Sequence, residues 1–581
     1  MNSPTPSAAS SPSPSSTLSP EQRILDLEAM AAEPVDVLVI GGGVVGAGAA
    51  LDAASRGLSV AIVEARDWAS GTSSRSSKLV HGGLRYLEML DFRLVFEALR
   101  ERGILMKTVA PHLVRPITFM YPLTHRVWER FYVGAGIMLY DFLALLGGKR
   151  DKGLSWNKHF SRTGARKALP GLNQQALIGA IRYSDAQVDD ARLTMTIIKT
   201  ARVHGAKTAN WTEATELLRD GDRVLGAVIR DQESGKSYTV TAQQTIIAGG
   251  VWTENIQNLG DVPAEMLVHA SKGIHIIVDK AKLSGESGIL LRTEQSVLFV
   301  IPWGNQWIIG TTDTPWKLQK EHPSANRQDI DYLLNHVNTI LEQPLTHDDV
   351  VGVYAGLRPL VSAKEERTTR ISREHHVEHP LENLSVIAGG KLTTYRVMAK
   401  DVVDAAMKNT AQVPKSQTDT LPLIGAVELG GIQEKFAKLA AQYQIDESQY
   451  PRLINRYGSL VTEIFAMIEQ NSALAGTLPS SQNYLYAEAL YAVTHEGALH
   501  LEDVLTRRTR ISVETADRGV DSAEAVAALI APALGWDAET TQREVQRYRD
   551  RVKYERLAAV EQSDELSEQV RLLAGEVHTA A

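Results

Sequence analysis

The sequence predicts an α/β protein with an inserted antiparallel sheet and an all-helical C-terminal domain. An apolar strand at residues 35–40 leads into a glycine-rich turn and a helix. Segments rich in Val, Ile and aromatic residues follow in the middle of the chain, separated by turn residues, as in an antiparallel sheet. Beyond a Pro-containing linker the pattern becomes helical. Several domains are expected, because the 581 residues exceed the roughly 250–300 that one core supports.

The composition excludes several classes of function. Apolar residues make up 44% and charged residues 22% of the chain, which is typical of a soluble globular protein. The net charge of −8 gives no basic surplus for nucleic acid, so no such partner is expected. The absence of cysteine rules out disulfides, thiolate catalysis, thiolate metal ligands and Cys-linked cofactors. We expect no metal centre, and any cofactor to be held non-covalently.

Two segments raise the question of a membrane. Residues 1–20 are rich in Ser, Pro and Ala and lack the basic start and apolar core of a signal peptide, so a disordered tail is predicted. Residues 130–148 are apolar, but their uncharged run from 131 to 140 is far short of the ~20 residues needed to span a bilayer. The favoured interpretation is a buried helix. The alternative is a partly exposed helix that rests on a bilayer surface.

The motif at residues 35–65 predicts a dinucleotide site. Gly41, Gly43 and Gly46 fit G-x-G-x-x-G between the first strand and a helix that starts with small residues. Such glycines let the backbone turn tightly and approach a pyrophosphate at the helix N-terminus. Glu64 ends the second strand, where it can accept hydrogen bonds from a ribose.

Two later glycine turns favour FAD over NAD. One apolar strand ends at Gly249-Gly250, and another leads into "AGGKLTTYR" and a helix. Three widely spaced strand-to-glycine turns suit one extended FAD that the chain contacts repeatedly. The helix after Lys391 can direct its N-terminal N–H groups at the flavin pyrimidine oxygen. Arg358, Arg373 and Lys391 stand at expected turns on the same side, and Arg suits bidentate phosphate or carboxylate contact.

These stretches resemble a known family. The match rests on residues 41–102, which include "SSKLVHGGLRYLE", and on "IPWGNQWIIGTTDTPW", "GLRPL", "AGGKLTTYRVMAKD" and "LEDVLTRRTRIS". They are similar to the FAD-dependent, aerobic, membrane-associated glycerol-3-phosphate dehydrogenases. The resemblance covers roughly residues 34–536. It implies a glutathione-reductase-like, Rossmann-type FAD domain, an antiparallel β substrate-binding cap and an all-α C-terminal domain.

The expected domain boundaries follow from this resemblance and from the composition. They are a tail at 1–20, the FAD domain at 21–410 with cap segments at about 110–180 and 265–375, a linker at 411–426, and the helical domain at 427–581. The resemblance implies oxidation of sn-glycerol 3-phosphate to dihydroxyacetone phosphate. It also implies electron transfer to a membrane quinone, a peripheral position on the cytoplasmic side of the cell membrane or in the cytoplasm, and a possible homodimer.

The family's site residues map onto this chain one by one. His81, Arg85 and Arg358 are the expected catalytic residues, and His81 is the group of its stretch that titrates near neutrality. Arg373, Lys391 and Arg85 are the expected phosphate ligands, although Arg370 is an alternative to Arg373. The expected FAD contacts are Gly41, Gly43, Gly46, Glu64, Ser77, Lys78, Gly82, Gly249, Gly390, Leu392 and Thr393. The ammonium and guanidinium groups beside Gly82-Gly83 would then face a flavin ring and an anionic substrate.

Alternatives remain open at this point. A glycerol-3-phosphate oxidase would share every residue named and pass electrons to O₂. A flavin amine oxidase-like enzyme could use Arg358 for an amino-acid carboxylate. A flavin-binding protein without turnover and an NAD dehydrogenase are the further rivals. The basic run "TRRTR" at residues 506–510 is either internal or solvated ion pairs, or a contact for an acidic partner or anionic lipid headgroups.

Overall fold

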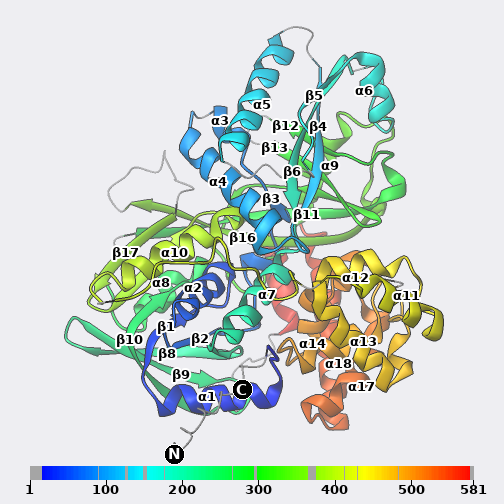
Figure 1. Cartoon of the computed structure of the whole chain (residues 1–581). Coiled ribbons are helices and arrows are strands. Elements are labelled where there is room, and N and C mark those ends of the chain that lie inside the picture. The colour runs from blue at the N-terminus through cyan, green and yellow to red at the C-terminus, as the bar shows by residue number, and fades with distance from the viewer. Residues whose placement is uncertain are drawn as a thin grey trace, which may run out of the picture.

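A computed structural model describes residues 16–575, with the exception of 89, 125–127, 148–153, 176, 265, 294–296, 364–374, 411, 428 and 482. Three bodies meet at the centre of the molecule (Figure 1). The nucleotide-binding sheet and its helices form one, the cap sheet with α5, α6 and α9 forms the second, and the C-terminal helices form the third. The predicted fold class is confirmed.

A mostly parallel sheet, with β17 and β9 as antiparallel strands, forms the centre of the first body. Its order is β17-β18-β10-β1-β2-β7, and β1 (Val35–Ile40) lies parallel to both β2 (Val60–Val63) and β10 (Ser237–Ile247). The outer strands are β7 (Lys207–Ala209), β18 (Leu384–Gly389) and β17 (His375–Leu381), while β8 (Thr212–Asp220) and β9 (Arg223–Asp231) extend β10. Successive residues of β1 enter different cores, because Val37 and Val39 pack on one face and Leu38 and Ile40 on the other.

Three helices cover one face of this sheet. α2 (Val44–Ser55) packs against both α7 (Asp190–Val203) and α10 (Tyr395–Ala406). Its first turns are built from small residues, and Gly48 lies where a Cβ would come within 3.0 Å of Tyr395 and Ala399. The small side chains therefore allow the helix whose N-terminus faces the glycine turn to pack closely.

The cap contains a sheet with the order β15-β11-β14-β13-β12-β4-β6-β3. β11 (Met266–Asp279) pairs with β16 (Val350–Ala363) over most of its length. The other strands are β3 (Leu79–Val80), β4 (Arg115–Leu123), β5 (Lys158–Phe160), β6 (Gly179–Gln187), β12 (Gly288–Arg292), β13 (Val297–Trp303), β14 (Gln306–Gly310) and β15 (Thr314–Pro315). The predicted antiparallel pairing fails in one place in the cap, where β4 and β12 pair in parallel.

The short strand β3 connects the two sheets. It pairs with β6 at the edge of the cap, and it follows directly after the stretch 70–78, which belongs to the nucleotide-binding body. β3 lies outside the predicted cap segments, and β6 runs past their limit to Gln187. The cap is therefore attached to the first body through the residues that precede His81.

The C-terminal domain is helical, as predicted. Its longer helices are α11 (Ile432–Tyr443), α12 (Gln449–Tyr457), α13 (Val461–Gln470), α14 (Tyr486–Thr494), α17 (Val520–Leu534), α18 (Ala538–Ala558) and α19 (Asp564–Arg571). The linker packs against the rest of the protein, because Leu423 is buried and donates its N–H to the carbonyl of Val109.

The predicted N-terminal tail ends earlier than expected. Leu18 is buried and donates its N–H to the carbonyl of His495, and α1 (Pro20–Ala32) begins at Pro20 with Ser19 as its N-cap. Residues 1–15 lie outside the described residues.

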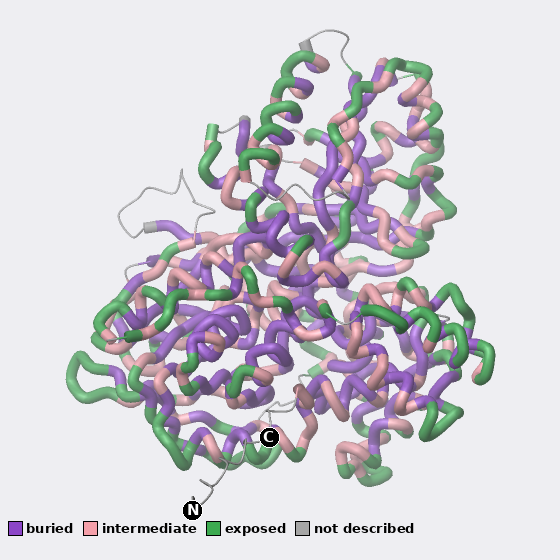
Figure 2. The backbone as a smooth tube through the Cα atoms, in the orientation of Figure 1, coloured by how far each residue is buried: buried purple, intermediate pink, exposed green. Residues whose placement is uncertain are grey.

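The favoured interpretation of residues 130–148 as a buried helix is also wrong. α5 (Trp128–Leu146) stands at the far end of the cap with one face open (Figures 1 and 2). Phe131 is 74% exposed and Leu146 57%, whereas Ile137 and Tyr140 on the opposite face are buried. Among the described residues, no helix has both the length and the apolar character that crossing a membrane requires.

Candidate active site

A cavity of about 1180 Å³ lies where the three bodies meet. Its floor is the carboxyl end of the parallel strands β1, β2 and β18, and its roof is formed by β11 and β16 of the cap. Ligands of open α/β sheets bind at this end of the strands. The volume exceeds the 300–1,000 Å³ that is typical of small-molecule sites, as an extended dinucleotide requires.

The glycine turn after β1 brings backbone segments into direct contact. Gly41 has φ +120°, and a Cβ there would lie 2.5 Å from the carbonyl oxygen of Ala248. A Cβ at Gly46 would lie 1.9 Å from the carbonyl oxygen of Gly41. Gly41 and Gly43 line the cavity, whereas Gly46 lies behind the turn, where its lack of a side chain lets α2 approach β1.

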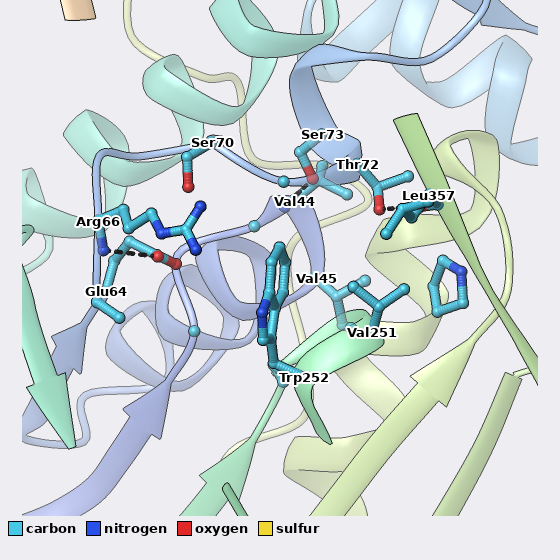
Figure 3. Close-up of a pocket in the computed structure, with 18 of the residues that line it drawn as sticks. Val44, Val45, Glu64, Arg66, Ser70, Thr72, Ser73, Val251, Trp252 and Leu357 are labelled. Carbon is cyan, nitrogen blue, oxygen red and sulfur yellow. Dashed lines mark hydrogen bonds between the residues drawn. The ribbon is translucent and has the colours of Figure 1, made fainter. Parts of the chain in front are cut away.

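The end of β2 holds Glu64 in a fixed position (Figure 3). Its carboxylate accepts hydrogen bonds from the N–H of Gly42 (2.6 Å) and of Arg66 (3.0 Å). Burial raises the pKa of Glu64, and these two N–H donors oppose the rise. The carboxylate therefore lies beside the glycine turn, as a group that binds a ribose must.

Hydroxyl groups line the next part of the cavity. The Oγ of Ser73 accepts the N–H of Val44 at the start of α2 (2.9 Å), and the hydroxyl of Thr72 donates to the carbonyl of Leu357 in β16 (2.5 Å). Figure 3 shows both contacts, with the indole of Trp252 standing opposite. The sequence analysis did not single out Thr72, Ser73 or Trp252, although the run "SGTSSRSS" was a signal for such a hydroxyl-lined loop.

The cavity is also lined by three residues that were expected to act in catalysis or in phosphate binding. His81, Arg358 and Lys391 all line it. The backbone of His81 is fixed by Thr393, whose Oγ1 accepts the N–H of His81 (3.0 Å) and donates to its carbonyl (3.1 Å). Arg358 is oriented by Thr311 Oγ1 (2.8 Å) and by the carboxylate of Asp313 (3.1 Å). Lys391 Nζ lies 3.6 Å from the centroid of the Tyr86 ring.

The cavity unites most of the predicted FAD contacts. They are Gly41, Gly43, Glu64, Ser77, Gly249, Gly390, Leu392 and Thr393. Three others lie elsewhere. Besides Gly46, Lys78 turns its Nζ away to Asp190 (2.7 Å), and Gly82 packs where a Cβ would meet Leu99 and Tyr140. The side chain of Arg85, at the start of α3 (Arg85–Glu88), and the residues Arg370 and Arg373 lie outside the description. Their roles stay predictions.

His275 is a site residue that the sequence analysis missed. It lines the cavity from β11, its Nε2 lies 2.8 Å from Ser77 Oγ, and its ring stacks on Tyr354 with centroids 4.8 Å apart. Burial lowers the pKa of His275 well below its ordinary value, and Arg358 and Lys78 lower it further. The imidazole is therefore neutral at pH 7. The strand "SKGIHIIVD" gave no local signal that His275 faces inward, because alternate residues of a cap strand face either side.

Together, the mostly parallel sheet, the glycine turn with its acidic residue, and the roofed cavity define a dinucleotide-binding protein. Comparisons with known proteins specify it further. Residues 36–405 match the family model for FAD-dependent oxidoreductases, and residues 416–541 match that for the C-terminal domain of alpha-glycerophosphate oxidase. FAD is thus the cofactor, and the glycine turn, Glu64 and the hydroxyl-lined segment offer what its phosphates and ribose need.

Relatives extend over nearly the whole chain. Glycerol-3-phosphate dehydrogenase 2 of Mycobacterium tuberculosis is 49% identical over 97% of this chain and 96% of its own. The mitochondrial glycerol-3-phosphate dehydrogenase of Homo sapiens is 35% identical over 90% of this chain and 73% of its own. The crystal structure of the Bacillus halodurans glycerol-3-phosphate dehydrogenase complexed with FAD is 26% identical, with a TM-score of 0.75, covering 92% of this chain and 98% of that one. The chain belongs to the FAD-dependent glycerol-3-phosphate dehydrogenase family.

Replacement of Gly46 by Ala is expected to release FAD. The new Cβ would lie 1.9 Å from the Gly41 carbonyl, so the turn that faces the pyrophosphate must open. Overpacking of this kind costs about 1–3 kcal/mol. If that cost falls on FAD binding, each 1.4 kcal/mol weakens the binding roughly tenfold. The FAD-to-protein ratio of the purified variant measures this. Gly136→Ala in α5 is the control, because its Cβ would meet nothing within 4 Å. Equal FAD content in both variants would contradict the geometry.

The neutral state of His275 predicts a pH dependence of stability. Since its pKa is lower in the folded than in the unfolded chain, the unfolded chain binds the proton first as the pH falls below about 6.5. The contribution of His275 to stability is complete above that pH and is lost progressively below it. His275→Gln is therefore expected to show a shallower fall in thermal midpoint between pH 7.5 and 5 than the wild type. Parallel curves would show that His275 is not buried in its neutral form.

Proposed function

We propose that the protein oxidises sn-glycerol 3-phosphate to dihydroxyacetone phosphate and passes the electrons through FAD to a membrane quinone. The observation that carries the proposal is that His81, Arg358 and Lys391 all line the FAD cavity. A phosphate dianion next to a hydroxyl that must be deprotonated requires this combination of cations and a base. The names of the relatives at 49% and 35% identity support the same substrate.

Each side chain has an assigned role. His81 accepts the proton of the C2 hydroxyl, and Thr393 keeps the backbone of His81 in place for this. Arg358 stabilises the negative charge that develops on the C2 oxygen, since Asp313 and Thr311 already fix its guanidinium group. Lys391 binds the phosphate, together with Arg85 and Arg373. FAD, when bound, supplies the two-electron acceptor.

His275 is the second candidate for the base. Its imidazole is neutral and lines the same cavity, but its Nε2 is engaged by Ser77. His81 differs in following directly after β3, at the junction between the cap and the nucleotide-binding body. The two histidines are therefore distinguished by replacement of each in turn.

The exposed face of α5 supports a peripheral membrane position. Its outward apolar side chains form one stripe along the helix. They are Phe131, Tyr132, Met138, Leu139, Phe142, Leu145 and Leu146. We propose that this stripe rests on the cytoplasmic surface of the cell membrane, where a quinone is available. The possible homodimer remains a prediction from the sequence.

Turnover with an artificial dye as electron acceptor tests the substrate and the base. Activity is expected with sn-glycerol 3-phosphate and not with glycerol, glycine or proline. His81→Asn is expected to lower kcat by about 10²–10⁴-fold, the usual contribution of a general base. His275→Asn is expected to keep most of the activity, because in this proposal the His275 side chain does not take the proton.

Oxidation of an amino acid instead would favour the amine oxidase alternative. Formation of peroxide faster than reduction of a quinone would favour the oxidase.

Replacement of two exposed phenylalanines tests the membrane surface. If α5 lies in the headgroup region, burial of each phenylalanine side chain contributes about 1.5–3 kcal/mol to membrane binding. Phe131→Glu with Phe142→Glu is therefore expected to weaken binding to phosphatidylglycerol-containing vesicles by at least about tenfold, in a flotation assay. Leu225→Glu, an exposed apolar residue in β9, is the control. Unchanged flotation of the double variant would refute the role of α5.

A further inference from the structure

The basic run at residues 506–510 faces inward. Arg507, Arg508 and Arg510 are all buried, so they offer no surface to an acidic partner or to lipid headgroups. Arg508 pairs with Asp67 in the loop after β2 (2.6 Å), and Arg507 contacts the same carboxylate. Arg510 instead pairs with Asp189 (2.6 Å) and Asp190 (2.5 Å) at the start of α7. The run thus joins the C-terminal domain to the nucleotide-binding body.

Asp190 connects Arg510 to the cavity wall. Its Oδ1 accepts hydrogen bonds from Arg510 and from Lys78 Nζ (2.7 Å). Its Oδ2 accepts the N–H of Ser76 (2.9 Å) and the hydroxyl of Ser76 (2.7 Å). One buried carboxylate therefore binds a helix start, a residue of the C-terminal domain and the segment 74–78.

That segment is held at further points by the same groups. The carbonyl of Ser74 accepts hydrogen bonds from Arg510 Nη1 and from Lys78 Nζ, each at 3.2 Å. The carbonyl of Ser76 accepts the hydroxyl of Tyr354 in the cap (2.9 Å). Lys78 adopts φ +57°, a left-handed conformation that these contacts must maintain.

The opposite side of the segment faces the cofactor cavity. Ser76 and Ser77 line it, Ser77 contacts His275, and the chain continues through β3 to His81. A displacement of the segment would therefore move the wall of the FAD site and the base beside it together.

We propose that Arg510 is a positioning residue for the FAD site: from the C-terminal domain, it holds segment 74–78 in place through Asp190 and the Ser74 carbonyl. The C-terminal domain thereby completes a cofactor site to which this arginine contributes no direct contact. The inference rests on FAD as the cofactor and not on the proposed substrate, so the two fail separately.

Arg510→Met is suited to test this. After the replacement Asp189 keeps Arg456 (2.9 Å) and Asp190 keeps Lys78, so neither carboxylate is left without a cation. FAD-loaded protein is diluted in series, and the released FAD is measured by its fluorescence. The dissociation constant for FAD is expected to rise at least fivefold, and Arg510→Lys is expected to restore part of the affinity, because it returns the charge to Asp190.

Arg202→Met is the matched control. Arg202 is another buried arginine, which pairs with Asp26 at the opposite end of α7 and lies apart from segment 74–78. Its replacement is expected to lower the thermal midpoint while the FAD dissociation constant stays within twofold of the wild type. FAD release that is equal in the Arg202 and Arg510 variants would reduce Arg510 to a general structural role and overturn the proposal.

Ser76→Ala provides a second, milder test. It removes one hydroxyl from Asp190 and buries no new charge, so it addresses the same link if Arg510→Met fails to fold. Its FAD dissociation constant is expected to rise at least twofold. If Ser76→Ala and Arg510→Lys, each made singly, both kept the wild-type FAD dissociation constant, the link would be refuted.

Discussion

The site depends on a steric constraint at the turn after β1, where backbone contacts backbone with no space for a side chain. Gly41 lies against the carbonyl of Ala248 and Gly46 against that of Gly41, so β1, β10 and α2 meet at van der Waals distance. This close approach gives α2 its direction toward the cavity and leaves N–H groups at its start for an anion. Glu64 and the hydroxyl-bearing loop after β2 are arranged around the same turn.

Charge buried between the bodies sets the remaining geometry. Asp67 and Asp190 each bind arginines of the C-terminal domain, and each lies next to a segment that borders the cavity. Buried charges are costly unless they are paired and hydrogen-bonded, so these pairs favour the arrangement of the bodies that keeps the partners together. In the cap, Asp313 and Thr311 hold the guanidinium group of Arg358, which lines the cavity, in a similar way.

The parts predictable from the sequence are those that depend on local backbone geometry. The fingerprint from Gly41 to Glu64 and the turn at Gly390 follow from glycine spacing and strand pattern, and both line the cavity. The sequence did not show that the Lys78 ammonium turns away from the cavity, because its partner Asp190 is distant in sequence. The composition of α5 could not show which face stays open, since a helix that packs on a core and one that packs on a bilayer share the same apolar pattern. Arg85 and Arg373 stay predictions.

Anaerobic mixing of the FAD-loaded protein with sn-glycerol 3-phosphate tests the central claim most directly. The account requires that the absorption bands of oxidised flavin disappear, that one dihydroxyacetone phosphate forms per flavin, and that deuterium at C2 slows the change. A flavin spectrum that stays oxidised in the presence of this substrate would contradict it, however well the cavity fits FAD.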